Sequence, residues 1–296
     1  MLHGLSARKD ESFISLQPLD NFYQTSAFFP LPFALITTVD DSGQTGIGPH
    51  ALVFPFIVAG EHSLLLISRS SSGTAHNLRR SRRCALNYIE FDKHALSTVA
   101  LLGYPGQSAE EKRKESDFTL IPSPTEALCT APAAPMIIEE AFQIFECTWD
   151  DTVEINIKGK TGEEHGESHF VLRINDILLK EHYKKQLDEG GHFPAMPIFY
   201  GFRDGANFWF AEHKKPFAIP IPKGTGAPVQ AVFYLANRLD EHVTFTRQAC
   251  EKLSGIPRPF LNPALKDIIA EAKKRGVAQV DGATLDTINT ARKKTG

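Results

Sequence analysis

The chain has 296 residues and a mass of 32.8 kDa, with 42 % hydrophobic and 23 % charged residues. This length accommodates two domains, or one large domain with an accessory, and the globular composition excludes a disordered linker. No segment reaches the ~18 uncharged apolar residues of a membrane helix, and the first residues lack the order of a signal peptide. We therefore expect a soluble, cytoplasmic protein without a membrane partner.

Charge separates the C-terminal end from the rest of the chain. The net charge is −3, but residues 246–296 carry ten Lys/Arg and five Asp/Glu, so this segment is at +5 and the remainder at −8. The basic residues lie among acidic ones at helical spacing and not in one block. This pattern predicts solvated helix faces and no nucleic-acid partner.

Short apolar runs separated by turn residues begin at residue 33. Phe33–Val39, a turn at Asp40–Gly43 and a second run at Ile47–Val53 predict a hairpin. The same reasoning predicts strands at Leu64–Ser68, Ala85–Ile89, Leu96–Leu102, Ile144–Trp149, Val153–Ile157, Phe170–Leu179 and Phe208–Phe210. Helices are predicted at Thr74–Ser81, Ser108–Glu115 and Glu181–Glu189. Closely spaced strands without a strand–helix rhythm favour a mainly β fold, an antiparallel barrel with a few helices.

Two proline-rich stretches interrupt this pattern. Residues 121–135 and 215–228 hold four prolines each. Proline has no N–H to donate to a neighbouring strand, so neither stretch is predicted to be an interior strand. We expect both to be surface loops.

The C-terminal segment predicts three helices. Thr246 caps the first, which ends at Ser254; Asn262 caps the second with Pro263 at its first position; Asp281 begins the third. The second helix carries an apolar stripe of Leu265, Ile268, Ile269 and Ala272. We expect a small three-helix module over residues 243–296, after a larger domain over residues 1–242.

The segment Ser68–Asn77 has the composition of an anion site. It leaves an apolar strand, passes through hydroxyl residues and a glycine, and enters a helix at Thr74. The N–H groups at a helix start, serine and threonine hydroxyls and the Arg69 guanidinium all favour a phosphate. An alternative is a serine-rich loop in which Thr74 only caps the helix and Arg69 is solvated. The arginines that follow could recruit a second phosphate, such as that of a pyridine nucleotide, or form a solvated face: Arg79, Arg80, Arg82 and Arg83.

The order of several segments resembles the flavin reductase-like family, which is built on the FMN-binding split barrel. The matching segments are Pro32–Thr38, Asp40–Gly43, Gly48–Phe54, Ser68–Asn77, Cys84–Asn87, Pro135–Ile138, Phe145–Cys147 and Ser168–Arg173. The resemblance covers residues from about 25 to 215. It departs at Ser72, where many relatives have a second basic residue, and at His50, where smaller residues are commoner.

The resemblance implies a split β-barrel in which the Ser68–Asn77 loop holds the FMN phosphate and the first hairpin lies along the flavin. It implies a homodimer, with FMN as cofactor or substrate and NADH or NADPH as hydride donor. The cofactor-binding residues that carry over are Thr37, Thr38, Gly48, Pro49, His50, Ala51, Ser68, Arg69, Ser70, Thr74 and Asn77.

Other chemistry has little support in the sequence. His50 could hydrogen-bond the flavin ring or the substrate, or be satisfied within the barrel wall. His165 and His169 are four residues apart, but Gly162 and Gly166 argue against a helix that would pair them on a metal. The cysteines form no C-x-x-C pair, so neither a disulfide framework nor a zinc site is predicted. No acid–base pair has a readable spacing, so catalytic residues are unassigned.

The tail resembles a second family, the small helical module at the C-terminus of a subunit of light-independent protochlorophyllide reductase. The matching residues are Phe245–Ala249, Leu253, Ile256–Pro257, Phe260, Ala272–Gly276 and Ala291–Arg292. The tail departs from that module at Phe245, where tryptophan is usual, and at Gln248, where glutamate is usual. We interpret the tail as a docking or regulatory element, not as evidence for chlorophyll synthesis.

Three functions are consistent with these patterns. The first is an FMN-binding oxidoreductase that takes hydride from NADH or NADPH and passes electrons to flavin, oxygen or a protein partner docked on the tail. The second is a non-enzymatic carrier of flavin or tetrapyrrole. The third is a relative of pyridoxamine-phosphate oxidase on the same barrel. The flavin itself carries redox chemistry, so a missing acid–base motif is compatible with the first.

Overall fold

The computed structural model describes residues 12–58, 60–104, 108–125, 134–153, 155, 166–189, 192–202, 206–217, 219 and 227–295. The chain divides into two compact units, Met1–Pro216 and Phe217–Gly296, and each is described by itself. None of the described helices is long and apolar enough to cross a lipid bilayer.

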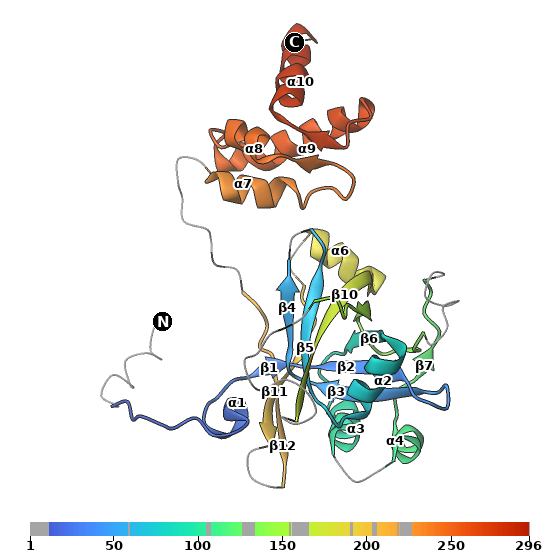
Figure 1. Ribbon diagram of the computed structural model, residues 1–296. Helices are drawn as coiled ribbons and strands as arrows, with labels where there is room; N and C mark the ends of the chain where they lie inside the picture. Colours follow the sequence, from blue (N-terminus) through green and yellow to red (C-terminus); the bar gives the residue numbers. More distant parts are fainter. Residues whose placement is uncertain are drawn as a thin grey trace. The chain divides into compact units, whose positions relative to one another are not determined.

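The first unit is built mainly from strands (Figure 1). Its strands are β1 (Leu31–Pro32), β2 (Ala34–Val39), β3 (Thr45–His50), β4 (Val53–Ile57), β5 (Ser63–Arg69), β6 (Arg83–Tyr88), β7 (Leu120–Ile121), β8 (Ile137–Ile138), β9 (Gln143–Trp149), β10 (Glu167–Leu179), β11 (Pro197–Phe202) and β12 (Phe208–Glu212). Its helices are α1 (Phe22–Thr25), α2 (Gly73–Ser81), α3 (Lys93–Gly103), α4 (Ala109–Glu115) and α6 (Glu181–Glu189).

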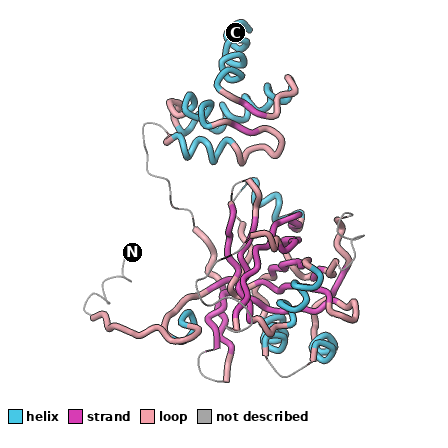
Figure 2. Tube along the Cα trace, viewed as in Figure 1, coloured by secondary structure: helices cyan, strands magenta, loops and turns pink. Residues whose placement is uncertain are grey.

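Seven of these strands form one antiparallel, curled sheet in the order β3-β2-β6-β9-β10-β5-β4. Figure 2 shows how these strands dominate the unit. A three-stranded sheet, β1-β11-β12, and the short pair β7-β8 complete it. The predicted mainly β fold is confirmed, and the sheet is that of a split barrel.

Both faces of the large sheet are covered at β2, which explains why every residue of this strand is buried. On one face, Ala34 and Ile36 pack with Ala75 and Leu78 of α2. On the opposite face, Leu35 belongs to a cluster that includes apolar side chains of α3. Because side chains alternate along a strand, neighbouring residues of β2 and β3 serve different faces. This alternation decides which predicted site residues can meet.

One strand prediction was wrong. Residues 96–102 belong to helix α3, because Asp92 caps it by accepting the N–H of Ala95 at 2.8 Å. Leu96, Val99 and Leu102 are then buried along one helical face. The predicted strand at Val153–Ile157 lies largely outside the described residues, as do long parts of both proline-rich stretches. Strands β4 and β11 were not predicted.

The helix α4 confirms its predicted capping box. Ser108 Oγ accepts the N–H of Glu111 at 3.2 Å, and the Glu111 carboxylate accepts the N–H of Ser108 at 2.8 Å. The predicted helix at Glu181–Glu189 is present as α6. The helix α2 begins at Gly73 and its cap is Ser72, not Thr74, because Ser72 Oγ accepts the N–H of Ala75 at 3.0 Å.

The second unit has its own apolar core. It contains α7 (Val229–Ala236), β13 (Thr244–Phe245), α8 (Arg247–Leu253), α9 (Arg258–Lys274), β14 (Gln279–Val280) and α10 (Gly282–Thr295). Three features agree with the prediction. Thr246 caps α8, and Asp281 accepts the N–H of Thr284 at the start of α10. The predicted apolar stripe on α9 is buried.

Two details of this unit differ from the prediction. The boundary between the units falls at residue 216 and not at 242, because Val232 and Ala236 of the unpredicted helix α7 are fully buried in the same core as α8 and α9. The helix α9 begins at Arg258, so Pro263 lies inside it. An earlier start adds Leu261, 3 % exposed, to the buried stripe, which offsets the one hydrogen bond lost at the proline.

Candidate functional site

The first turn of α2 lies directly on strand β3. Gly48 is the residue that permits this approach, because a Cβ atom at Gly48 would come within 2.5 Å of Thr74 Oγ1. His50 follows two residues later on the same face of β3, and its Nε2 lies 3.0 Å from Thr74 Oγ1. The structure thus brings together three predicted site residues from two segments.

Serine hydroxyls fix the loop between β5 and α2. Ser68 Oγ lies 2.8 Å from Ser72 Oγ, the helix cap, and Ser70 Oγ lies 2.8 Å from Ser168 Oγ of β10. Arg79 donates to the Ser70 carbonyl at 3.0 Å and to Ser168 Oγ at 2.5 Å. Ser68 and Ser70 are therefore buried supports of the loop, and their hydroxyls already have partners.

The helix start retains free donors. The N–H of Ala75 is used by Ser72 Oγ and that of His76 by the Ser72 carbonyl, at 3.0 and 3.1 Å. Among the residues that the structure describes, the N–H groups of Gly73 and Thr74 have no acceptor. Two free N–H groups at the positive end of a nine-residue helix are suited to a phosphate.

Arg69 is the last residue of β5 and begins the loop that leads to the helix. Its side chain is exposed at the end of β5. Tyr23 of α1 lies near it: burial raises the pKa of the Tyr23 hydroxyl, while the Arg69 guanidinium opposes that rise and Glu167 adds to it. The guanidinium is exposed and therefore accessible to an anion from solvent.

Burial also sets the charge of His50. It lowers the pKa of the imidazole to about 4, so the ring is neutral at pH 7. A neutral imidazole has one N–H donor and one acceptor nitrogen. His50 can therefore donate to Thr74 or accept from it, but it brings no positive charge to the loop.

The remaining predicted residues lie in other surroundings. Asn77 Nδ2 donates to Thr38 Oγ1 at 3.0 Å, which ties α2 to β2 beneath the helix start. Thr37 is fully buried on the opposite face of β2, where its Oγ1 accepts from Asn87 at 3.3 Å. Pro49 also faces that side and packs on Gly103 of α3, and Ala51 is partly buried in the same cluster. Thr37, Pro49 and Ala51 do not share a face with Thr74.

Three of the arginines after the loop, Arg79, Arg80 and Arg82, are engaged within the protein. Arg80 donates to the Val39 carbonyl and forms an ion pair with Asp41 at 2.8 Å. Arg82 pairs with Asp151. Arg80 and Arg82 therefore form neither a second phosphate site nor a freely solvated face, because their guanidinium groups bind α2 to neighbouring turns.

Three contributors were missed from the sequence. Ser72 was passed over as the helix cap because several hydroxyl residues precede the helix and each could fill that position. Ser168 joins the loop only through the pairing of β10 with β5. Tyr23 comes from the N-terminal arm, and its local sequence predicts no electrostatic interaction with Arg69.

Comparison with known proteins adds an independent finding. The family model described as flavin reductase like domain matches residues 26–197, more than half of the chain. The chain belongs to the flavin reductase-like family. A search of curated proteins found no match.

Solved structures agree with the fold of this family member. It is similar to 2-nitrobenzoate 2-nitroreductase of Pseudomonas fluorescens, with 16 % identity and a TM-score of 0.50 over 71 % of this chain and 96 % of that chain. It is similar to nitrilotriacetate monooxygenase component B of Bacillus cereus, with 16 % identity and a TM-score of 0.51 over 70 % and 100 %. It is also similar to flavoredoxin of Desulfovibrio vulgaris, with 14 % identity and a TM-score of 0.50 over 71 % of this chain and 96 % of that chain. At these identities the likeness concerns the fold.

The family match covers the elements of the candidate site. The match includes β2, β3, the Ser68–Asn77 loop and all of β10, which are the elements that build the helix start. A flavin-related oxidoreductase is the class of protein that this family supports. The matched region ends before the second unit, so the predicted likeness of that unit to a protochlorophyllide reductase module stays a prediction.

Proposed function

We propose that the protein binds FMN at the start of α2 and catalyses its reduction by NADH or NADPH, with electrons passing on to flavin, oxygen or a protein partner. The observation that carries this proposal is the pair of N–H groups at Gly73 and Thr74 that have no acceptor among the described residues, in the same loop as the exposed Arg69, in a member of a flavin reductase-like family. Its location in the cytoplasm stays a prediction.

The residues present fit a phosphate monoester. The helix start offers two N–H donors, Thr74 offers a hydroxyl, and Arg69 supplies the positive charge that a dianion requires. Gly48 keeps the strand beneath the helix free of a side chain that would displace Thr74. FMN carries such a phosphate, and riboflavin does not.

The protein's own contribution is binding and orientation. FMN, when bound, supplies the hydride and electron transfer, so the chain needs no acid–base pair. Hydrogen bonds among Ser70, Ser168 and Arg79 fix the loop between β5 and α2. The bond from Asn77 to Thr38 fixes α2 on β2. These contacts preorganise the donors, which saves the cost of ordering the loop when the ligand binds.

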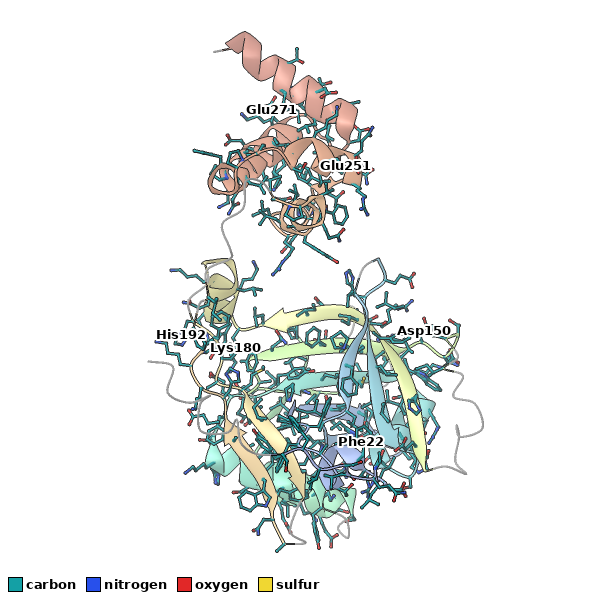
Figure 3. The ribbon with its side chains drawn as sticks, turned by 90° about the vertical axis from the view of Figure 1, so that its left-hand side faces the viewer. Phe22, Asp150, Lys180, His192, Glu251 and Glu271 are labelled. Atoms are coloured by element: carbon teal, nitrogen blue, oxygen red, sulfur yellow. The ribbon has the colours of Figure 1, made fainter. Side chains whose placement is uncertain are left out.

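We also propose that the protein is a homodimer. Residues 13–29 expose many large apolar side chains, among them Phe13, Phe22 and Phe28 at 105, 56 and 80 %; Figure 3 labels Phe22. An exposed apolar surface of this kind suits an interface with a second copy. Light scattering is expected to give about twice 32.8 kDa; a clean monomer that binds FMN stoichiometrically would overturn the dimer.

The second unit is proposed to be a docking element for a protein electron acceptor. Its core is self-contained, and it contains no group that we assign to flavin binding. Transfer to such a partner should weaken with salt, because exposed charges are screened over about 8–10 Å, whereas turnover with a small neutral acceptor should not.

The absorption spectrum of purified protein, followed by NADH and NADPH addition, tests the main proposal. A yellow protein, or one that binds added FMN, with catalytic bleaching supports the oxidoreductase. Stoichiometric FMN binding without turnover supports the flavin carrier instead. Turnover only with a phosphate-ester amine supports the pyridoxamine-phosphate-oxidase-like reading. Failure to bind either FMN or riboflavin overturns the proposal.

A further inference from the structure

The contact between His50 and Thr74 has a specific proton arrangement available to it. Thr74 Oγ1 belongs to the residue that also supplies one of the free N–H groups, and His50 Nε2 lies 3.0 Å from it. Thr74 is 7 % exposed as a residue. The imidazole is its hydrogen-bond partner in the structure.

A threonine hydroxyl has one proton, and the tautomer of His50 decides where that proton points. If Nε2 is bare, it accepts the Thr74 proton, and Thr74 then presents only lone pairs to an anion. If Nε2 carries the proton, it donates to Oγ1, and the hydroxyl proton is free to point toward an acceptor beside the helix start. Thr74 therefore repels a phosphate when Nε2 of His50 is bare, and can donate a hydrogen bond to a phosphate when Nε2 carries the proton.

We propose that His50 is a positioning residue that donates from Nε2 to Thr74 and so orients the Thr74 hydroxyl toward the flavin phosphate, which makes the site prefer FMN over riboflavin. This inference rests on the proposed function. A neutral ring suits the role, since burial keeps the pKa of His50 near 4 and the ring adds direction and not charge. Gly48 is part of the arrangement, because a Cβ there would lie 2.5 Å from Thr74 Oγ1 and 3.2 Å from His50 Nε2.

The test compares FMN and riboflavin affinity, measured by quenching of flavin fluorescence, in wild type and variants. His50→Phe removes the donor, Thr74→Val removes the hydroxyl at similar shape, and the double variant removes both. Each single variant is expected to weaken FMN about tenfold, the usual scale for a hydrogen bond to a charged group, with little change for riboflavin. The double variant should lose no more than either single variant, because His50 acts through Thr74.

Conservative replacements keep the test informative if His50→Phe does not fold. A glutamine amide nitrogen reaches the position of Nε2, whereas an asparagine amide is too short, so His50→Gln should retain FMN preference and His50→Asn should lose it. His62→Phe is the control, because His62 is an exposed histidine at the other end of β5. Nitrogen NMR of the FMN complex should show His50 neutral with its proton on Nε2.

Several results would overturn the inference and leave the proposed function intact. One is equal loss of FMN and riboflavin in His50→Phe, which would place His50 against the ring or in the fold. Others are additive losses in the double variant or a proton on Nδ1. Equal affinity of the wild type for both flavins, or its failure to bind any flavin, would instead remove the proposed function itself.

Discussion

Replacing Gly48 by alanine tests the packing on which the whole site depends. The new Cβ would stand 2.5 Å from Thr74 Oγ1, and ordinary contact begins at 3.4 Å, so an atom must move by about 0.9 Å. If the first turn of α2 moves, overpacking costs between about 1 and 3 kcal/mol of stability. If Thr74 rotates instead, its bond to His50 is lost, at about 1 kcal/mol. Both routes misplace the Thr74 hydroxyl, so FMN affinity should fall more than riboflavin affinity.

Gly46 offers a matched control on the same strand and the same face. A Cβ atom there meets nothing within 4 Å, so Gly46→Ala should stay within about 0.5 kcal/mol of the wild type. Urea unfolding gives the stability of both variants, and fluorescence titration gives their flavin affinities. Equal urea midpoints for the two variants, together with unchanged FMN binding by Gly48→Ala, would refute the reasoning.

Three further predictions concern the loop, a turn and the unit boundary. Arg69→Ala should weaken FMN by roughly 1.5–3 kcal/mol and leave riboflavin almost unchanged, because only FMN carries the dianion; equal losses in a titration would remove Arg69 from the site. Although burial opposes it, hydrogen bonds from Ser42, Gln44 and Arg113 lower the pKa of Asp40 to about 2, so its contribution, on the order of 1 kcal/mol, should be complete above pH 3.8 and disappear as pH falls toward 2. Asp40→Asn should flatten that part of the urea midpoint profile, and an unchanged profile would contradict the assignment. A chain ending at residue 216 should express as a soluble flavin-binding unit, whereas one ending at 242 should aggregate, because it exposes the core side of α7; equal solubility would argue against the boundary.

Local signals in the sequence determined a large part of the structure. The caps at Ser108, Thr246 and Asp281 were predicted because each is a hydrogen bond between residues three apart, which the sequence shows directly. The antiparallel strands were predicted because apolar runs and turn residues alternate at short spacing. The Ser68–Asn77 loop was predicted to be the anion site from composition and family resemblance, and it stays a proposal.

Long-range contacts decided the rest. The run at residues 96–102 is equally apolar as a strand or a helix; the Asp92 cap begins α3, and packing against Leu35 and its neighbours buries one of its faces. The helix α9 begins before its proline because Leu261 can be buried in a core to which α7 contributes.

The site shows the same division. Resemblance to the family placed Gly48, His50 and Thr74 among the binding residues, but their contact joins segments 24 residues apart and depends on α2 covering one face of β3. It also placed Thr37 and Pro49 with them. Because side chains alternate along β2 and β3, both residues point to the face of the sheet opposite α2. Composition and spacing indicate which residues are available for a site. Which of them meet depends on strand register and on the helix that packs above, because these are set by burial across the whole sheet.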